Sequence, residues 1–161
     1  MIVFHGFTKR YERRGIFNLE EVLPYIGHTR VFDGTEISLT SDRYRLFEQN
    51  SACVTCGIEG LYFALERSAK RIAIQVPGTG RHRYEMSVMI SKPPDHRVHE
   101  WHLNLYALRE DGTEVLMTKD HIIPRSKGGQ DVFWNYQTMC APCNSRKGCR
   151  LPLAASAYAG A

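Results

Sequence analysis

A short segment near the end of the sequence, residues 120–148, gathers side chains that could catalyse hydrolysis. It contains Asp120-His121, then Asn135, and then Cys140-Ala141-Pro142-Cys143-Asn144. A neutral imidazole can accept a proton from water near pH 7, because its ordinary pKa is about 6.5. Carboxylate and amide oxygens are ligands for hard divalent cations such as Mg²⁺ and Mn²⁺. The segment therefore combines a candidate general base, oxygen ligands for a cation and two cysteines with metal-ligand spacing.

The cysteines occur in two Cys-x-x-Cys pairs, Cys53/Cys56 and Cys140/Cys143, with Cys149 left over. This spacing allows the thiolates of both pairs to bind one tetrahedral zinc ion. A redox-active pair is the alternative, but two pairs in one small chain favour a shared metal. Four thiolates leave no open coordination position, so the zinc is expected to be structural. We expect Cys149 to be a free thiol.

The composition is that of an ordinary globular protein. The 161 residues are 43% hydrophobic and 24% charged, with a formal net charge of +4. No stretch approaches the roughly 20 apolar residues of a membrane span, and the first apolar run is too short for a signal peptide. We therefore expect one principal domain in the cytoplasm, where the reducing environment disfavours disulfides, and no association with a membrane.

Residues 1–50 are predicted to form an N-terminal extension with short helices. Asn18-Leu19-Glu20-Glu21 has the pattern of a capping box, which predicts that a short helix begins there. Residues 31–39 are expected to be extended around an Asp33-Gly34 turn. Ser41-Asp42 is expected to begin a second helix, which leads the chain to the first cysteine pair.

Residues 51–150 are predicted to form the main module, with an α+β fold. A turn at Pro77-Gly78-Thr79-Gly80 between two alternating runs predicts an inserted β-hairpin at residues 67–98. The small, uncharged tail 151–161 is expected to be poorly ordered. The sequence pattern predicts further strands at residues 61–66 and 98–108, residues 114–123 are β-prone, and residues 136–139 can form a short strand.

Positive charge is concentrated in the predicted hairpin. From Arg67 to Arg97 there are seven basic and two acidic residues, a local net charge of +5, so the rest of the chain carries a net charge of −1. A basic insertion is compatible with a polyanionic partner. Arg81 and Arg83, close to the turn, are therefore candidates for contacts with nucleic acid. The alternative is a solvated hairpin with ordinary surface side chains.

The combined motif resembles the HNH endonuclease family in its zinc-stabilised form. The resemblance is carried by Asp120-His121, Asn135, Asn144-x-x-Lys147-Gly148 and the two cysteine pairs, roughly a quarter of the chain. It implies a ββα-metal unit, similar to a treble clef. In such a unit one strand ends at the Asp-His pair, a loop returns through the central Asn, and a second strand leads into a helix. Asn144 stands at the third motif position in place of histidine, a departure that occurs within the family.

The resemblance also implies a role for each site residue. His121 would be the general base, and Asp120 and Asn144 would hold one Mg²⁺ or Mn²⁺ ion, which would act as a Lewis acid. An amide oxygen is a harder ligand than imidazole, so the site should prefer these cations over zinc. Asn135 would brace the loop that orients His121. Two further residues, Arg125 and Lys147, are candidates for contacts with flanking phosphates.

A nuclease that acts on DNA is thus the expected function. A compact protein of this kind would suit a phage, and would then act in the host cytoplasm. The first alternative is a zinc-stabilised nucleic-acid-binding module without catalysis, but a pure binder has no need for the base and both cation ligands. The second alternative is an RNA-directed nuclease. The neighbouring aromatic residues Phe133, Trp134 and Tyr136 are expected to pack in the core more than to stack on bases.

Overall fold

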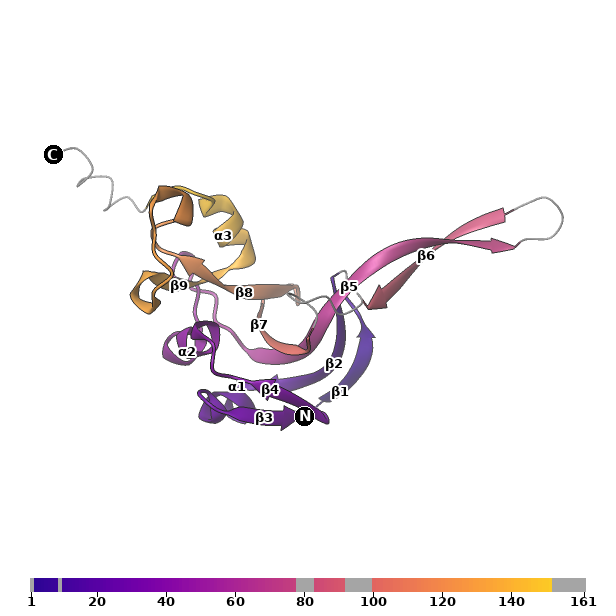
Figure 1. Ribbon diagram of the computed structural model, residues 1–161, viewed down its shortest axis with the longest axis horizontal. Coiled ribbons are helices and arrows are strands. Elements are labelled where there is room, and N and C mark those ends of the chain that lie inside the picture. Colours follow the sequence, from indigo (N-terminus) through magenta and orange to yellow (C-terminus); the bar gives the residue numbers. More distant parts are fainter. Residues whose placement is uncertain (1, 9, 78–82, 92–99, 152–161) are drawn as a thin grey trace.

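The computed structural model describes residues 2–8, 10–77, 83–91 and 100–151, with only the backbone for 2–7, 70–77 and 83–91 (Figure 1). Its main feature is a seven-stranded antiparallel sheet, in which the order is β1-β2-β5-β7-β8-β9 and β6 pairs with β5. The mixed α+β class predicted from the sequence is confirmed. The strands are β1 (Ile2–Phe7), β2 (Tyr11–Asn18), β5 (Tyr62–Pro77), β6 (Arg83–Ser91), β7 (His102–Leu108), β8 (Glu114–His121) and β9 (Tyr136–Cys140).

The helices are short, and two of them begin where the sequence predicted. At the start of α1, the Asn18 backbone N–H donates to Glu21 Oε2 at 2.9 Å, as a capping box requires. Ser41 is the N-cap of α2. In the described part of the chain, no helix has the length and apolar character needed to cross a membrane. The helices are α1 (Leu19–Val22), α2 (Asp42–Gln49) and α3 (Ala141–Lys147), with 3₁₀ turns η1 (Leu23–Tyr25), η2 (Arg125–Lys127) and η3 (Phe133–Asn135); β3 (Thr29–Phe32) and β4 (Thr35–Ser38) form a separate hairpin.

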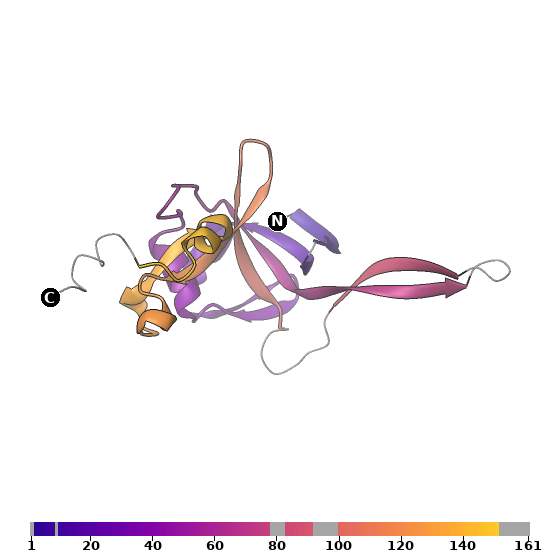
Figure 2. The same cartoon turned by 90° about the horizontal axis from the view of Figure 1, so that it is seen from above.

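Strand β5 belongs to two parts of the fold. Residues 62–68 pair with β2, whereas residues 69–77 pair with β6. Both views of the molecule show the β5–β6 ribbon projecting from the remaining elements (Figures 1 and 2). The sequence analysis expected two separate strands in place of β5. The strand is continuous because residues 67–71 contain no glycine or proline that would break it.

Strands β1 and β2 were not predicted, and for β2 a buried charged residue explains why. Arg13 of β2 is only 4% exposed, so this strand lacks the apolar alternation of a half-buried strand. Arg13 Nε donates to Glu66 Oε1 at 2.7 Å, and Arg13 Nη1 donates to Glu114 Oε1 at 2.6 Å. Burial of this guanidinium is tolerated because carboxylates from β5 and β8 pair with it. The pairing also ties the N-terminal strands to the strand that carries the predicted site.

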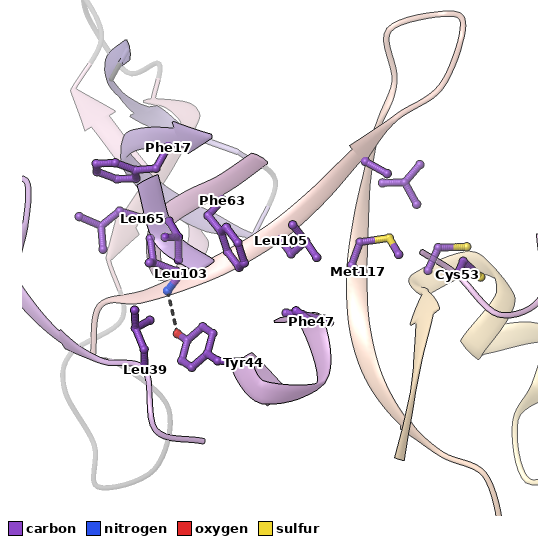
Figure 3. Close-up of a cluster of buried hydrophobic side chains, with 14 of the residues drawn as sticks. Phe17, Leu39, Tyr44, Phe47, Cys53, Phe63, Leu65, Leu103, Leu105 and Met117 are labelled. Atoms are coloured by element: carbon purple, nitrogen blue, oxygen red, sulfur yellow. Dashed lines mark hydrogen bonds between the residues drawn. The ribbon is translucent and has the colours of Figure 1, made fainter. Parts of the chain in front are cut away.

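The hydrophobic core lies between one face of the sheet and α2 (Figure 3). Phe47 of α2 and Phe63 of β5 are both buried, with ring centroids 6.4 Å apart. The backbone N–H of Leu103 in β7 donates to the Tyr44 hydroxyl at 3.1 Å. Cys53 belongs to the same buried cluster. The core therefore extends from the centre of the sheet to the first cysteine pair and fixes that pair relative to the strands.

Candidate active site and metal centre

Two strands and a helix meet around the predicted catalytic residues. β8 pairs with β9 in a register that places Asp120 opposite Gln137. α3 follows β9 directly, and its Asn144 Nδ2 donates to Thr118 Oγ1 at 3.0 Å. Thr118 and Asp120 share one face of β8, because alternate residues of a strand point to the same side. Helix α3 therefore lies over the face of β8 that carries Asp120.

Asp120 is largely buried, and two side chains hold its carboxylate. Its Oδ2 accepts a hydrogen bond from Gln137 Nε2 at 2.9 Å and lies 2.9 Å from Lys147 Nζ. Lys147 Nζ also donates to the backbone oxygen of His121 at 2.5 Å. Within the described part of the chain, neither Asp120 Oδ1 nor Asn144 Oδ1 has a hydrogen-bond partner. One side-chain oxygen of each predicted cation ligand is thus left without a hydrogen bond from the residues that the structure describes.

His121, the last residue of β8, contacts a carboxylate that the sequence analysis missed. Its Nε2 lies 2.6 Å from Asp131 Oδ1, and its ring meets the Tyr136 ring edge-on with centroids 5.0 Å apart. Asp131 Oδ1 also accepts from Arg125 Nε at 2.9 Å and from Arg125 Nη2 at 2.7 Å. Hydrogen bonds from His121 and Arg125 lower the pKa of Asp131 to about 2. The only signal in the sequence was an acidic residue in the loop between His121 and Asn135.

Asn135 closes the loop that connects β8 to β9. Its side chain is buried, and its Oδ1 accepts from the backbone N–H of Ile123 at 2.9 Å. Its Nδ2 donates to the backbone oxygens of Ile123 at 3.1 Å and Gln130 at 2.9 Å. Gly129 permits this closure, since a Cβ on it would lie 1.7 Å from the Ile123 backbone oxygen. The side-chain amide of Asn135 therefore holds both ends of the loop that carries Arg125 and Asp131.

The four predicted zinc ligands come together from two distant parts of the sequence. The Sγ atoms of Cys53, Cys56, Cys140 and Cys143 all lie within 4.8 Å of one another, and none is in a disulfide. The Cys56 and Cys140 sulfurs are 3.7 Å apart. Thiolates at ~2.3 Å from a tetrahedral zinc would be about 3.8 Å apart. The donor set and its spacing therefore fit a metal such as zinc.

Backbone geometry presents the first cysteine pair to the second. The Gly57 N–H donates to the Cys53 oxygen at 2.8 Å, and Gly57 has a φ of 75°, which favours glycine. The Val54 N–H donates to the Thr138 oxygen of β9 at 3.0 Å. This bond docks the first pair beside Cys140, the last residue of β9. The knuckle at residues 53–57 is thus part of the framework that positions β9.

The thiol pKa values show how the cluster distributes charge. Burial disfavours the Cys53 thiolate, but hydrogen bonds from the backbone N–H groups of Cys140, Cys56 and Thr55 outweigh it and lower the pKa of Cys53 to about 6. Burial raises the pKa of Cys140 to about 12. Closely spaced thiols ionise unequally because one thiolate disfavours the next. A divalent cation would stabilise the thiolate form of all four ligands.

A groove of about 900 Å³ lies between the first cysteine pair and α3. Gln137 and Lys147 are among its lining residues, and both contact Asp120. Asp120 itself does not line the groove, and Gln137 and Lys147 connect it to the groove wall. Three cations in the lining give it the charge to receive a polyanion. The remaining lining residues are Val54, Thr55, Cys56, Met139, Cys143, Arg146, Arg150 and Leu151.

Comparison with known proteins identifies the part of the chain that contains this geometry. Residues 109–157 match the family model described as HNH endonuclease. The match supports the assignment of this part of the chain to the HNH endonuclease family. The HNH domain suggests nuclease activity and implies a nucleic acid as the substrate. No curated protein and no solved structure matches the chain. The HNH match spans β8, β9 and α3, whereas Cys53 and Cys56 lie outside it.

Two side chains of the HNH domain that were expected on phosphates are engaged elsewhere. The Arg125 guanidinium contacts Asp131, and the Lys147 ammonium contacts Asp120 and the His121 backbone oxygen. Their phosphate contacts stay predictions. In the predicted hairpin, Arg81 lies outside the described residues and Arg83 is described only by its backbone in β6. The tail residues 152–161 also lie outside the described residues.

One expectation about the aromatic residues of the HNH domain is wrong. Trp134 is 77% exposed and does not pack in the core, whereas Tyr136 is buried as expected. The 3₁₀ turn η3 directs consecutive residues to different sides. Asn135 takes the inward position because its amide bonds to the loop backbone, so Trp134 is turned to the surface.

Proposed function

We propose that this protein is a metal-dependent endonuclease that hydrolyses DNA phosphodiester bonds, with His121 as the general base. The observation that carries the proposal is the meeting of β8 and α3. It brings His121 and Asp120 of the strand to the same end of the unit as Asn144 of the helix. This order of strand, strand and helix is that of a ββα-metal unit. A module that only binds nucleic acid would have no use for a base beside two oxygen ligands.

His121 would take the proton of the attacking water. The imidazole has two ring nitrogens, and a nitrogen that donates to a carboxylate leaves the other to accept a proton. Since Nε2 is directed at Asp131, Nδ1 would be the atom that accepts it. The Tyr136 ring contacts the imidazole edge-on and restricts its rotation. Asn135 would act indirectly, because it holds the loop on which the orientation of His121 depends.

Asp120 and Asn144 would hold one Mg²⁺ or Mn²⁺ ion, because each offers a hard oxygen that has no partner in the described part of the chain. When bound, such a cation supplies charge to stabilise the phosphate and the leaving 3′ oxygen. Lys147 and Gln137 fix the Asp120 carboxylate against α3 before any cation binds. These contacts would preorganise the Asp120 carboxylate beside the helix that carries Asn144, so that both oxygen ligands are in place for the cation.

The cysteine cluster would hold a structural zinc ion. The metal would join residues 53–56 to the junction of β9 and α3, where Cys140 and Cys143 lie. Asn144 directly follows Cys143 and Lys147 is one turn further along α3, so the zinc would set the position of the helix that carries both. The catalytic geometry would therefore depend on a zinc ion that joins two segments far apart in the sequence.

DNA would approach along the cationic groove. Arg146, Lys147 and Arg150 line it, and Lys147 reaches Asp120. The projecting β5–β6 ribbon would add a second contact, through Arg83, the first residue of β6, and through Arg81, which precedes it in the sequence. Groove and ribbon together supply positive charge on two separate parts of the molecule, as binding to a long polyanion requires.

The test is cleavage of supercoiled plasmid by purified protein with Mg²⁺ or Mn²⁺, beside His121→Ala. We expect nicked or linear product from the wild type and intact plasmid from the variant, with zinc content unchanged. His28→Ala, a change at an exposed histidine outside the site, is the matched control and should cleave normally. Wild-type cleavage by His121→Ala would refute the base assignment. A parallel RNA substrate distinguishes the RNA-directed alternative, and binding without cleavage would support the non-catalytic one.

A further inference from the structure

Three side chains contact one carboxylate oxygen in the loop between β8 and β9. Asp131 Oδ1 lies 2.6 Å from His121 Nε2 and 2.7 Å from Arg125 Nη2. The Tyr136 hydroxyl lies 3.4 Å from the same atom. The His121 side chain is 19% exposed, whereas those of Asp131 and Arg125 are 53% and 69% exposed. The contacts thus form a shell that covers one edge of the imidazole from the solvent side.

The loop that carries this shell is fixed by the fold and not by the ion pair alone. Asn135 Nδ2 donates to the backbone oxygen of Gln130, the residue before Asp131. The Lys127 and Gly129 N–H groups both donate to the Pro124 oxygen, at 2.8 Å and 3.0 Å, which folds the chain tightly around Arg125. Arg125 and Asp131 are therefore brought together by a closed loop, and their side chains meet in front of His121.

We infer that Asp131 is a positioning residue for His121, and that Arg125 acts by holding Asp131. The inference rests on the proposed function. By accepting from Nε2–H, Asp131 fixes both the tautomer and the orientation of the ring, as carboxylates do for metal-bound and catalytic histidines. An exposed carboxylate alone would rotate freely. Both donating nitrogens of Arg125 contact the same atom, Asp131 Oδ1, and these two charge-assisted hydrogen bonds hold that oxygen beside His121.

This assignment separates Arg125 from the residues that contact phosphate. A phosphate contact contributes mainly to binding, so its loss raises KM and changes the salt dependence. A positioning residue that acts through the base contributes to the chemical step, so its loss lowers kcat. The two roles also differ in coupling. If Arg125 acts only through Asp131, its removal has no further effect once Asp131 is gone.

The experiment measures kcat and KM for plasmid cleavage by Asp131→Ala, Asp131→Asn, Arg125→Ala and the double variant Arg125→Ala/Asp131→Ala. Loss of a residue that orients such a ligand or base costs roughly 10–100-fold, so Asp131→Ala should lower kcat by that factor with KM unchanged. Asp131→Asn keeps an oxygen that can accept from Nε2–H and should retain more activity than Asp131→Ala. Arg125→Ala should lower kcat by less, and the double variant should equal Asp131→Ala.

Controls separate this inference from folding and from the proposed function. Lys127→Ala removes a neighbouring exposed cation of the same turn and should leave kcat unchanged. Zinc content and thermal midpoint should be those of the wild type in every variant. An unchanged kcat for Asp131→Ala, additive losses in the double variant, or an equal loss in Lys127→Ala would overturn the inference. If His121→Ala is inactive while Asp131→Ala cleaves normally, only the positioning role fails; if the wild type cleaves nothing, the proposed function fails.

Discussion

Replacing Asn135 with alanine should reduce both stability and cleavage. The asparagine side chain is 6% exposed and makes three hydrogen bonds, one to the Ile123 N–H and two to the backbone oxygens of Ile123 and Gln130. At roughly 0.5–1.5 kcal/mol each, their loss amounts to about 1.5–4.5 kcal/mol of unfolding free energy. The net stability of a domain is ~5–15 kcal/mol, so the variant should remain folded.

Cleavage should fall further than this loss of stability explains. The loop released by Asn135→Ala carries Asp131, which contacts the His121 ring. We expect kcat to fall by roughly 10–100-fold, the range for residues that orient a ligand or base. The assay pairs urea unfolding, followed by tryptophan fluorescence at fixed zinc concentration, with single-turnover plasmid cleavage. Zinc content, measured on the same samples, shows that the metal centre is intact.

A matched control and a second variant sharpen the test. Asn50 is exposed, and its side chain makes one hydrogen bond, with the Ala52 N–H at 2.9 Å. Asn50→Ala should therefore cost less than about 1 kcal/mol and leave cleavage unchanged. Asn135→Asp keeps the acceptor for Ile123 but sets a carboxylate against two carbonyl oxygens, so it should be at least as damaging as alanine. Unchanged stability and cleavage in both Asn135 variants would refute the role of this amide.

The remaining predictions concern metal and DNA. Cys56→Ser should lose zinc and unfold the module, because the binding of structural zinc contributes roughly 10–16 kcal/mol to the folding free energy. A variant that is folded by circular dichroism and still cleaves plasmid would contradict this prediction. Charge reversal at Arg146 and Arg150 should weaken DNA binding and reduce the slope of log K against log salt concentration by about 2. Fluorescence anisotropy measures this slope, and an unchanged slope would show that the groove is not a DNA-binding surface. Charge reversal at Arg81 and Arg83 should flatten the slope in the same assay, and a wild-type slope would make the ribbon a solvated surface.

The elements around the site could be predicted because each has a local signature. β-prone residues in the order of the HNH motif indicated β8 and β9, a capping box indicated the start of α1, and Ser41-Asp42 indicated the start of α2. β2 could not be found in this way, because Arg13 is buried against carboxylates that lie far away in the sequence. Pattern rules treat a charged residue as exposed, and only a tertiary partner reverses that expectation.

The amino-acid sequence by itself determined the chemical inventory of this protein: a base, oxygen ligands, four thiols and an amide in the order of an HNH motif. Residue types and their order are enough for this inventory, and within residues 120–148 the short spacing also limits how far apart the groups can lie. The tertiary structure decided which groups meet. It placed Lys147 on Asp120 and set Asp131 against His121, and it brought Cys53 and Cys56 to the second cysteine pair, as their spacing had predicted. Such contacts depend on loop closure and on burial by distant strands, and neither is encoded by spacing alone.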